Sequence, residues 1–140
     1  MDDFLGCLPG YNLRRASTAI LSELADGLSE LELRPTDASM LITIGSKPGI
    51  TPSRLGKILG IQRANMVPLV ARLEERSAIV RIKRDGRSFE LELTPEGCDL
   101  CTRAKAILIA YEERFLLRVP PEHREHLVPA LRALWNHTYS

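Results

Sequence analysis

The chain has few of the residues that mark secreted, membrane-spanning or metal-binding proteins. Its 140 residues include three cysteines, three histidines and one tryptophan, and only 5% are aromatic. An odd number of cysteines does not form the disulfide framework of a small secreted domain, and no signal peptide is apparent, so a cytoplasmic location is expected. The apolar runs are far shorter than the roughly 20 residues that a membrane-spanning helix needs, so no membrane association is expected.

Patterns of catalytic and metal-binding residues are also missing. The sequence has no Gly-rich phosphate loop and no convincing pairing of a nucleophile with a base. Cys98 and Cys101 form a single C-x-x-C, without the second pair that a zinc site needs. His123 and His126 lie in the charged run "EHREH", which is more simply a solvated face. We therefore expect neither an enzyme nor a cofactor or metal site.

The sequence does contain a strongly uneven distribution of charge. The composition, 44% hydrophobic and 26% charged, is that of one ordinary globular domain with a net charge of +1. Between Arg54 and Arg87, however, nine lysines and arginines stand against three acids, which leaves this segment at +6 and the rest at −5. A basic middle on a mildly acidic body favours a localised site for a polyanion, although a solvated charged surface would look the same.

Apolar residues at steps of three and four predict that most of the chain is helical. Thr51 followed by Pro52, and Thr94 followed by Pro95, are typical N-terminal caps. Pro129 lies inside the last predicted helix and predicts a kink or a break there. Helices are expected over residues 11–31, from 36 to a stop at 47–49, over 52–60 and 62–76, from 95 onwards, and over 121–135.

The period changes from about four to two in the segments "AIVRIKR" and "SFELEL", which predicts two strands with one buried face each. Asp85-Gly86 between them predicts a two-residue hairpin turn, and the turn fixes the register. Val80 and Ile82 would then share the buried face with their apolar partners. The expected pairs are 84 with 87, 83 with 88, 82 with 89, 81 with 90 and 80 with 91.

In that register Arg84 and Arg87 face each other across the hairpin and repel. Folding gains nothing from two opposed cations, whereas a phosphate backbone would relieve their repulsion. The alternative is a solvated tip on which the two side chains splay apart. The segment before the hairpin favours the first interpretation.

That segment has helix-turn-helix spacing, with a tight turn at Gly60-Ile61 between a short helix and a longer one. The second helix opens with Gln62, Arg63 and Asn65. Gln and Asn can bond adenine and Arg can bond guanine, and this end of a recognition helix contacts base edges. Two helices that merely pack together are the alternative. A helix-turn-helix followed by a basic hairpin is a winged helix, which favours binding of double-stranded DNA.

Three stretches of the chain carry a more specific resemblance: "GYNLRRASTAI", "LRPTDASMLITI" and "ITPSRLGKILGIQRANMVPLVARLEERSAIVRIKRDGRSFELELTPEG". Together they resemble the MarR family of bacterial transcription regulators. The resemblance implies a mainly α fold with a small β-hairpin, formed by one domain over residues 1–140. A winged helix-turn-helix would cover about 34–94, and dimerisation helices about 5–32 and 95–138.

The resemblance also implies a homodimer, most often a repressor, that binds a pseudo-palindromic operator. Arg87 would enter the minor groove, and Asp85 would hold the wing arginines in place. The residues expected to contact DNA are Thr51, Ser53, Arg54, Gln62, Arg63, Asn65, Lys83, Arg84, Asp85 and Arg87.

The sequence departs from the family pattern within the recognition helix and the wing. Ser77 replaces the glycine that usually ends this helix, and because serine resists the left-handed conformation, we expect a different helix end. Pro68 cannot bond Ala64 through a backbone N–H, so a bend is expected. The wing carries Asp85-Gly86-Arg87 where the family often has Asp-Arg-Arg, and it looks shorter.

The family commonly releases DNA when a small aromatic or phenolic effector binds. Tyr11, Arg14 and Arg15 lie beside an apolar stripe and are candidates for holding an aromatic acid. Such arginines are more often exposed or bridge subunits.

The cysteines leave a second regulatory possibility open, a redox-sensing repressor of the same fold that uses Cys7, Cys98 or Cys101. Cys98, at the start of a helix, would be the likelier thiolate of the C-x-x-C pair. Buried cysteines are usually small packing residues. A further alternative is an interaction module that uses the winged helix without DNA.

Overall fold

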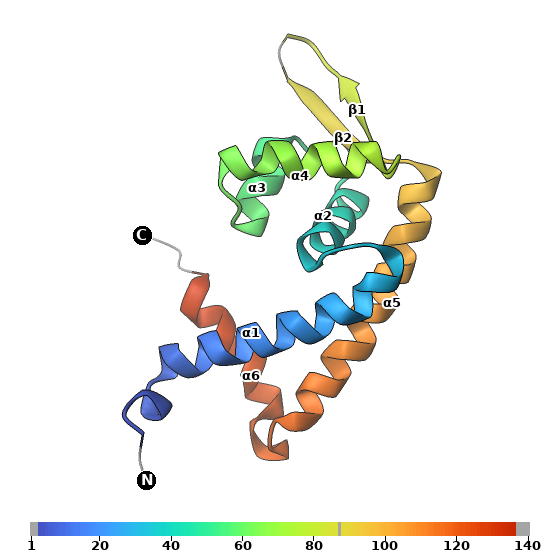
Figure 1. Ribbon diagram of the computed structural model, residues 1–140. Helices are drawn as coiled ribbons and strands as arrows, with labels where there is room; N and C mark the ends of the chain where they lie inside the picture. Colours follow the sequence, from blue (N-terminus) through green and yellow to red (C-terminus); the bar gives the residue numbers. More distant parts are fainter. Residues whose placement is uncertain (1–2, 87, 137–140) are drawn as a thin grey trace. The chain divides into compact units, whose positions relative to one another are not determined.

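The computed structural model describes residues 3–86 and 88–136 (Figure 1), and these residues are mainly helical with one hairpin, as the sequence predicts. The chain divides into two compact units, one up to Leu108 and one from Ile109. The α-helices are α1 (Pro9–Leu28), α2 (Pro35–Ser46), α3 (Pro52–Leu59), α4 (Arg63–Glu75), α5 (Pro95–Arg118) and α6 (Arg124–Trp135). The strands are β1 (Ile79–Lys83) and β2 (Phe89–Leu93), and short 3-10 turns cover Leu5–Cys7, Ser29–Leu31 and Pro121–His123. No helix within the described ranges is long and apolar enough to cross a membrane.

The core of the first unit is formed by leucine, isoleucine and methionine side chains from α1 to β2. Burying each of them removes enough apolar surface from water to favour folding by about 1.5–3 kcal/mol, as an upper estimate. The fully buried apolar side chains of this core include Leu28, Met40, Leu41, Ile44, Leu55, Leu73 and Leu91.

The predicted starts of α3 and α5 are confirmed by their cap hydrogen bonds. The Thr51 hydroxyl accepts a hydrogen bond from the Arg54 N–H at 3.2 Å, and the Thr94 hydroxyl accepts one from the Gly97 N–H at 2.9 Å. Gly60 ends α3 with a φ of 68°, a left-handed conformation that glycine adopts without strain. Short polar side chains and a glycine therefore set the length of the first helix of the helix-turn-helix.

The predicted hairpin register is wrong by one residue. Ile79 pairs with Leu93, Arg81 with Leu91 and Lys83 with Phe89. This leaves three residues, 85–87, between Arg84 and Ser88, in place of a two-residue turn. A shift of one residue moves every side chain of a strand to the other face. As a result, Ile79 is buried and Val80 is 44% exposed, the reverse of the expectation.

A contact outside the hairpin holds β2 with its expected face inwards, so the shift falls on β1, where Ile79 is buried and Arg81 reaches Glu74 of α4. The Leu91 N–H donates to the carbonyl of Ile50 at 2.9 Å, and the Leu91 carbonyl accepts from the Gly49 N–H at 3.1 Å. This bridge from the loop before α3 fixes which face of β2 is turned towards the core, and Leu91 is fully buried there. The pattern of alternating residues in the hairpin contains no information about that bridge.

The end of α4 also differs from the expectation. Ser77 adopts the left-handed conformation, with a φ of 60°. The Ala78 N–H then donates to the Leu73 carbonyl at 3.0 Å and the Ser77 N–H donates to the Glu74 carbonyl at 2.9 Å, which is the pattern of a Schellman motif. The helix therefore ends as it would with glycine, at a backbone cost of roughly 1–2 kcal/mol.

The prolines inside helices do not interrupt them. Helix α4 runs through Pro68, and α6 runs through Pro129, so the break considered at Pro129 does not occur.

In the second unit, the Arg124 side chain donates to the carbonyls of Leu116 and Val119, at 3.1 and 2.9 Å. These bonds satisfy backbone acceptors at and just beyond the end of α5. Apolar side chains that stay exposed in this unit are Ile109, Leu116, Leu117, Val128, Leu131, Leu134 and Trp135.

Candidate nucleic-acid interface

Helices α3 and α4 approach each other closely enough to form a helix-turn-helix. A Cβ at Gly56 would lie 3.0 Å from the Ile61 carbonyl oxygen and 3.1 Å from the Met66 side chain, so α3 carries no side chain at that point. The Ile61 N–H donates to the Gly56 carbonyl at 2.8 Å and fixes the turn. A buried glycine thus permits the close contact that orients α4.

The start of α4 presents the side chains that the sequence assigns to base reading. Gln62 is the N-cap residue, Arg63 is the first helical residue and Asn65 lies in the first turn. All three are exposed, whereas Met66 and Val70 on the same helix are buried. The unpaired backbone N–H groups of a helix start also favour an anion such as a phosphate.

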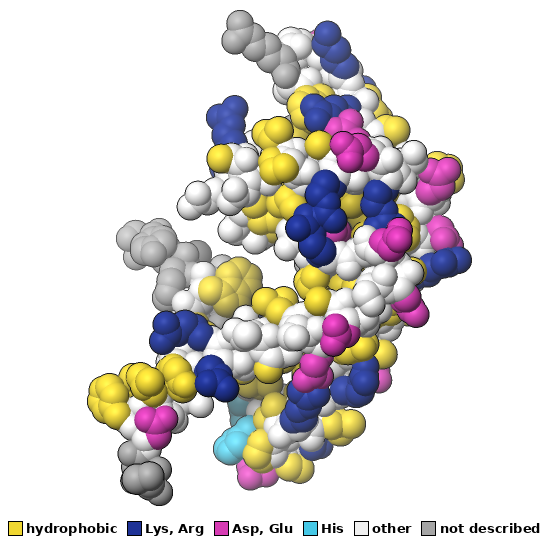
Figure 2. Space-filling view, in the orientation of Figure 1, with side chains coloured by type: hydrophobic (Ala, Val, Ile, Leu, Met, Phe, Trp, Pro, Cys, Tyr) yellow, Lys and Arg dark blue, Asp and Glu magenta, His cyan; other side chains and the backbone are white. Residues whose placement is uncertain are grey.

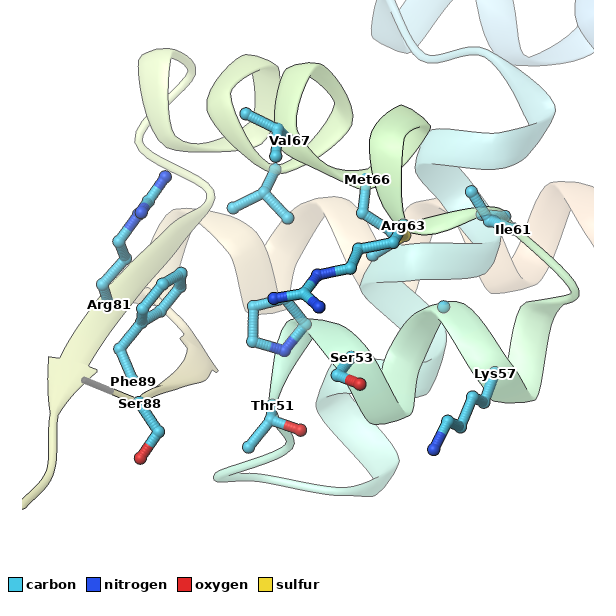
Figure 3. A pocket seen from close by; sticks show the side chains of 13 residues that line it. Thr51, Ser53, Lys57, Ile61, Arg63, Met66, Val67, Arg81, Ser88 and Phe89 are labelled. Atoms are coloured by element: carbon cyan, nitrogen blue, oxygen red, sulfur yellow. The ribbon is translucent and has the colours of Figure 1, made fainter. Parts of the chain in front are cut away.

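A groove of about 830 Å³ lies between α3, α4 and the hairpin. Figure 3 shows Arg63 reaching from α4 across this groove towards the side of α3 that carries Thr51 and Ser53. Three of the expected DNA-contacting residues therefore lie in one depression. The other residues that line it are Pro52, Gly56, Lys57, Ile61, Met66, Val67, Val70, Arg81, Ser88 and Phe89.

The hairpin is braced against α4 by Arg81. Its guanidinium donates to the Glu74 carboxylate at 2.7 Å and lies over the Phe89 ring, 4.4 Å from the ring centroid. The expected pairing of Arg81 with Glu90 is wrong because of the register shift. Glu74 belongs to a different element, so the spacing of residues in the hairpin could not indicate this contact.

At the hairpin tip, Arg84 pairs with Ser88 and with a carboxylate, so the register on which the expected opposition of Arg84 and Arg87 depended is not observed. The Arg84 N–H donates to the Ser88 carbonyl at 3.3 Å, and the Arg84 guanidinium binds the Glu90 carboxylate at 2.9 Å. Arg87 and its expected place in a minor groove lie outside the described residues. The case for DNA at the wing therefore depends on exposed cations: Lys83 is exposed, and the Arg84 side chain is 58% exposed despite its partner.

The remaining expected contact residues lie around the groove. Arg54 is exposed on α3, Thr51 is half-buried as the cap of that helix, and Asp85 is exposed at the hairpin tip. Figure 2 shows basic side chains interspersed with apolar ones over α3, α4 and the hairpin. Several residues that line the groove were not among those expected from the sequence to contact DNA. Of these, Lys57 and Arg81 belong to the basic segment, and Val67 and Ser88 carry no charge.

An ion pair between a buried carboxylate and a partly exposed arginine holds the second half of α4. Asp37 is fully buried; its carboxylate accepts from the Arg34 N–H at 2.9 Å and from the Arg72 guanidinium at 3.2 Å. One turn further along α4, Arg76 donates to the carbonyl of Leu31 at 2.7 Å. The recognition helix is therefore tied to the segment that connects α1 with α2.

The three candidate effector residues are on the first half of α1. The Tyr11 hydroxyl accepts a hydrogen bond from the Arg15 guanidinium at 3.1 Å, and this guanidinium lies 5.9 Å from the Tyr11 ring centroid. Arg14 is exposed. Tyr11 and Arg15 are thus paired with each other, and their role in holding an effector stays a prediction.

The cysteines are all free, but they occupy different environments. Cys7 and Cys98 are exposed, whereas Cys101 is buried with its Sγ 3.7 Å from the Leu41 carbonyl oxygen. Burial raises the pKa of the Cys101 thiol; neighbouring Cys98 adds to the effect and Lys105 opposes it. Because the thiolate is the reactive form, Cys101 is a poor nucleophile, and the structure favours a packing role for it.

The fold defines a winged helix-turn-helix protein, and comparisons with known proteins show which family it resembles. The model of the MarR family matches residues 33–89, which span the helix-turn-helix and most of the hairpin. A protein described as the transcriptional regulatory protein for the hcr operon of Thauera aromatica is 29% identical over 129 residues, covering 90% of this chain and 78% of the relative. The transcriptional repressor Rv2887 of Mycobacterium tuberculosis is 29% identical, covering 83% of this chain and 86% of the relative.

Solved structures agree with these relatives. The transcriptional repressor CouR bound to a 23-mer DNA duplex has a TM-score of 0.87 and 29% identity, covering 93% of this chain and 94% of CouR. CouR bound to p-coumaroyl-CoA has a TM-score of 0.86 and 27% identity, with 93% of each chain covered. The family model, the relatives and the solved structures thus agree with the resemblance of this chain to the MarR family.

Proposed function

We propose that this protein is a homodimeric, sequence-specific DNA-binding transcription regulator that acts as a repressor and works without catalysis in the cytoplasm. The observation that carries the proposal is the exposed set Gln62, Arg63 and Asn65 at the start of α4, beside a basic hairpin. Named relatives are repressors, and one was solved on a DNA duplex.

The proposal assigns different tasks to the two kinds of side chain at the interface. Lysines and arginines of the wing and α3 bind phosphates, which positions the protein on the duplex without reading sequence. Gln62, Arg63 and Asn65 contact base edges in the major groove. In a homodimer, the two copies of α4 would reach successive major grooves, with half-site centres about 34 Å apart or a multiple of this.

Exposed apolar side chains outside the winged helix support a dimer. Leu13 and Leu21 are exposed on α1 in the first unit, and Leu117 and Trp135 are exposed in the second unit. Exposed apolar side chains mark a protein–protein contact where they form a contiguous patch, as they would in a dimer interface. Analytical ultracentrifugation is expected to give twice the chain mass of 15.7 kDa.

An aromatic effector is the proposed means of release. CouR was solved with p-coumaroyl-CoA and Rv2887 with salicylic acid. We expect an aromatic acid or its acyl-CoA thioester to raise the thermal midpoint of this protein and to weaken its binding to DNA. If Arg15→Ala abolishes both effects while leaving DNA binding without the compound unchanged, Arg15 contributes to the effector site.

The central experiment measures discrimination between DNA sequences. A duplex selected from a random library, or the promoter adjacent to the protein's own gene, is compared with random DNA by fluorescence anisotropy. Asn65→Ala is expected to reduce the difference in binding free energy between the two DNAs by about 1–3 kcal/mol, because it removes a base contact. The control is Arg103→Ala, which changes an exposed residue of α5 that pairs with Asp99 one turn earlier in the same helix. No preference for any sequence in the wild type would favour the interaction module without DNA.

The wing is tested separately by the salt dependence of binding. Arg87→Ala is expected to weaken operator binding several-fold and to reduce the slope of log K against log salt by about 0.9 for each phosphate that the variant no longer neutralises. Arg103→Ala again removes one positive charge, from α5, and is expected to leave the slope unchanged. An unchanged slope in Arg87→Ala would reject the wing's contact with DNA.

A further inference from the structure

The outward face of the recognition helix is apolar although it is exposed. Ala64, Val67, Pro68 and Ala71 follow one another at steps of three, one and three residues, which places them on one face of α4. The first three are exposed and Ala71 is half-buried; Val67 is 67% exposed. The core-facing residues of α4, such as Met66 and Leu73, lie on the other side of the helix. The apolar face therefore has no partner within the described part of this chain.

The surroundings of this face are cationic. Val67 lines the same groove as Arg63, Lys57 and Arg81, and Figure 3 shows Val67 and Arg63 on the wall that α4 contributes. An apolar partner protein would gain little from a surface ringed by three cations. A polyanion that also carries apolar groups fits both features. The small size of the side chains lets the helix backbone approach such a partner closely.

Double-stranded DNA presents one apolar group in its major groove, the 5-methyl of thymine. Valine has no hydrogen-bond donor or acceptor, so it can distinguish bases only by contact with that methyl. We propose that Val67 packs against the 5-methyl group of a thymine in each operator half-site and makes that position specific for thymine. This inference rests on the proposed DNA-binding function.

Val67 is the best placed residue of the face for this contact. It is β-branched, so in a helix its χ1 has one strongly preferred value and its two methyls are held in place at little entropic cost. It follows Arg63 by one helical turn, a rise of about 6 Å along the axis. The thymine is therefore expected about two base steps from the base that Arg63 contacts.

The test removes the methyl without changing any hydrogen bond. The preferred operator is selected with the wild-type protein, and each thymine of a half-site is replaced in turn by deoxyuridine. One position is expected at which the replacement weakens binding of the wild type about fourfold per methyl, as for the loss of one buried methylene-sized group. In Val67→Ala the same replacement is expected to have no effect.

A matched variant shows that the result is specific. Val80→Ala makes the same change at another exposed valine, which lies on the face of β1 that does not line the groove. It is expected to keep the full sensitivity to deoxyuridine. Since alanine favours helix more than valine does, Val67→Ala is expected to fold, and circular dichroism checks this.

The proposal is overturned if no half-site of the selected operator contains a thymine sensitive to deoxyuridine. It is also overturned if Val67→Ala and the wild type lose the same affinity at the sensitive position. If the wild type prefers no DNA sequence, the proposed function itself is refuted. If it prefers one sequence but is insensitive to the thymine methyl, only the inference about Val67 is refuted.

Discussion

The ion pair between Asp37 and Arg72 gives a quantitative test of how α4 is held. We consider Arg72→Met, which keeps most of the length of the apolar stem and removes the guanidinium. The Asp37 carboxylate then stays buried, and its remaining partners are the Arg34 N–H at 2.9 Å and the Arg34 guanidinium at 3.7 Å. A buried charge that loses the closer of its two charged partners destabilises the folded state.

The magnitude follows from the burial of the two partners. Breaking a fully buried ion pair costs about 3–5 kcal/mol, and an exposed pair contributes about 0–1 kcal/mol. The Asp37 side chain is 2% exposed, but the Arg72 side chain is 37% exposed, so water screens the pair from one side. Within the described residues, Asp37 Oδ1 and Arg72 Nη1 are buried without a hydrogen-bond partner, which lowers the net gain further. We therefore expect Arg72→Met to lower the free energy of unfolding by about 2 kcal/mol.

The assay is equilibrium unfolding in urea at a fixed protein concentration, because the stability of a dimer depends on concentration. Arg103→Met is the matched control, since both partners of its pair with Asp99 are 62% exposed. The control is expected to change stability by no more than about 0.5 kcal/mol. The double variant Asp37→Asn with Arg72→Met is expected to lose less free energy of unfolding than the two single variants lose together, because it also removes the buried charge.

Two results would refute this reasoning. One is an Arg72→Met variant as stable as the Arg103→Met control, which would mean that the buried carboxylate does not depend on the guanidinium. The other is strict additivity in the double variant, which would show that the two side chains contribute independently.

Three further predictions concern the backbone and the cysteines. Ser77→Gly is expected to raise the free energy of unfolding by about 0.5–1 kcal/mol, because glycine adopts the observed φ of 60° without strain; a lower urea midpoint would contradict this. Gly97→Ala is expected to lower it by roughly 3 kcal/mol or more, because the new Cβ would lie 1.9 Å from the Ala78 carbonyl oxygen; a midpoint equal to that of the wild type would contradict this close approach. A thiol reagent is expected to label Cys98 quickly and Cys101 slowly in the folded protein, followed by mass spectrometry of the peptides; equal rates would show that Cys101 is accessible.

Features that depend on neighbours in the sequence could be predicted from the sequence. Thr51, Gly60 and Thr94 were assigned correctly to helix ends because each acts through hydrogen bonds or backbone preferences within a few residues. The helix-turn-helix and the exposed residues at the start of α4 followed from the same local signals. The left-handed conformation of Ser77 did not follow from local signals. The hydrogen bonds of the Schellman motif hold the serine in a conformation that it resists in isolation.

The candidate interface was predictable in part for the same reason. Residues 51–65 were assigned from caps and spacing, and Thr51, Ser53 and Arg63 do lie together in the groove. Val67 and Ser88 were missed because neither carries a charge or lies at a helix start. The partners expected for Arg81 and Arg84 were wrong, because a register shift of one residue gave both arginines different partners.

The sequence by itself determined the kind and order of the elements, the helix-turn-helix and the basic character of the segment from α3 to the wing. These depend on periodicity, caps and composition, which act over short stretches of chain. The tertiary structure alone decided which face of β1 is buried, the bridge between Ile50 and Leu91, and the pairing of Asp37 with Arg72. The residues of each pair are more than 30 positions apart in the chain, so packing of the whole unit brings them together and no local pattern specifies them.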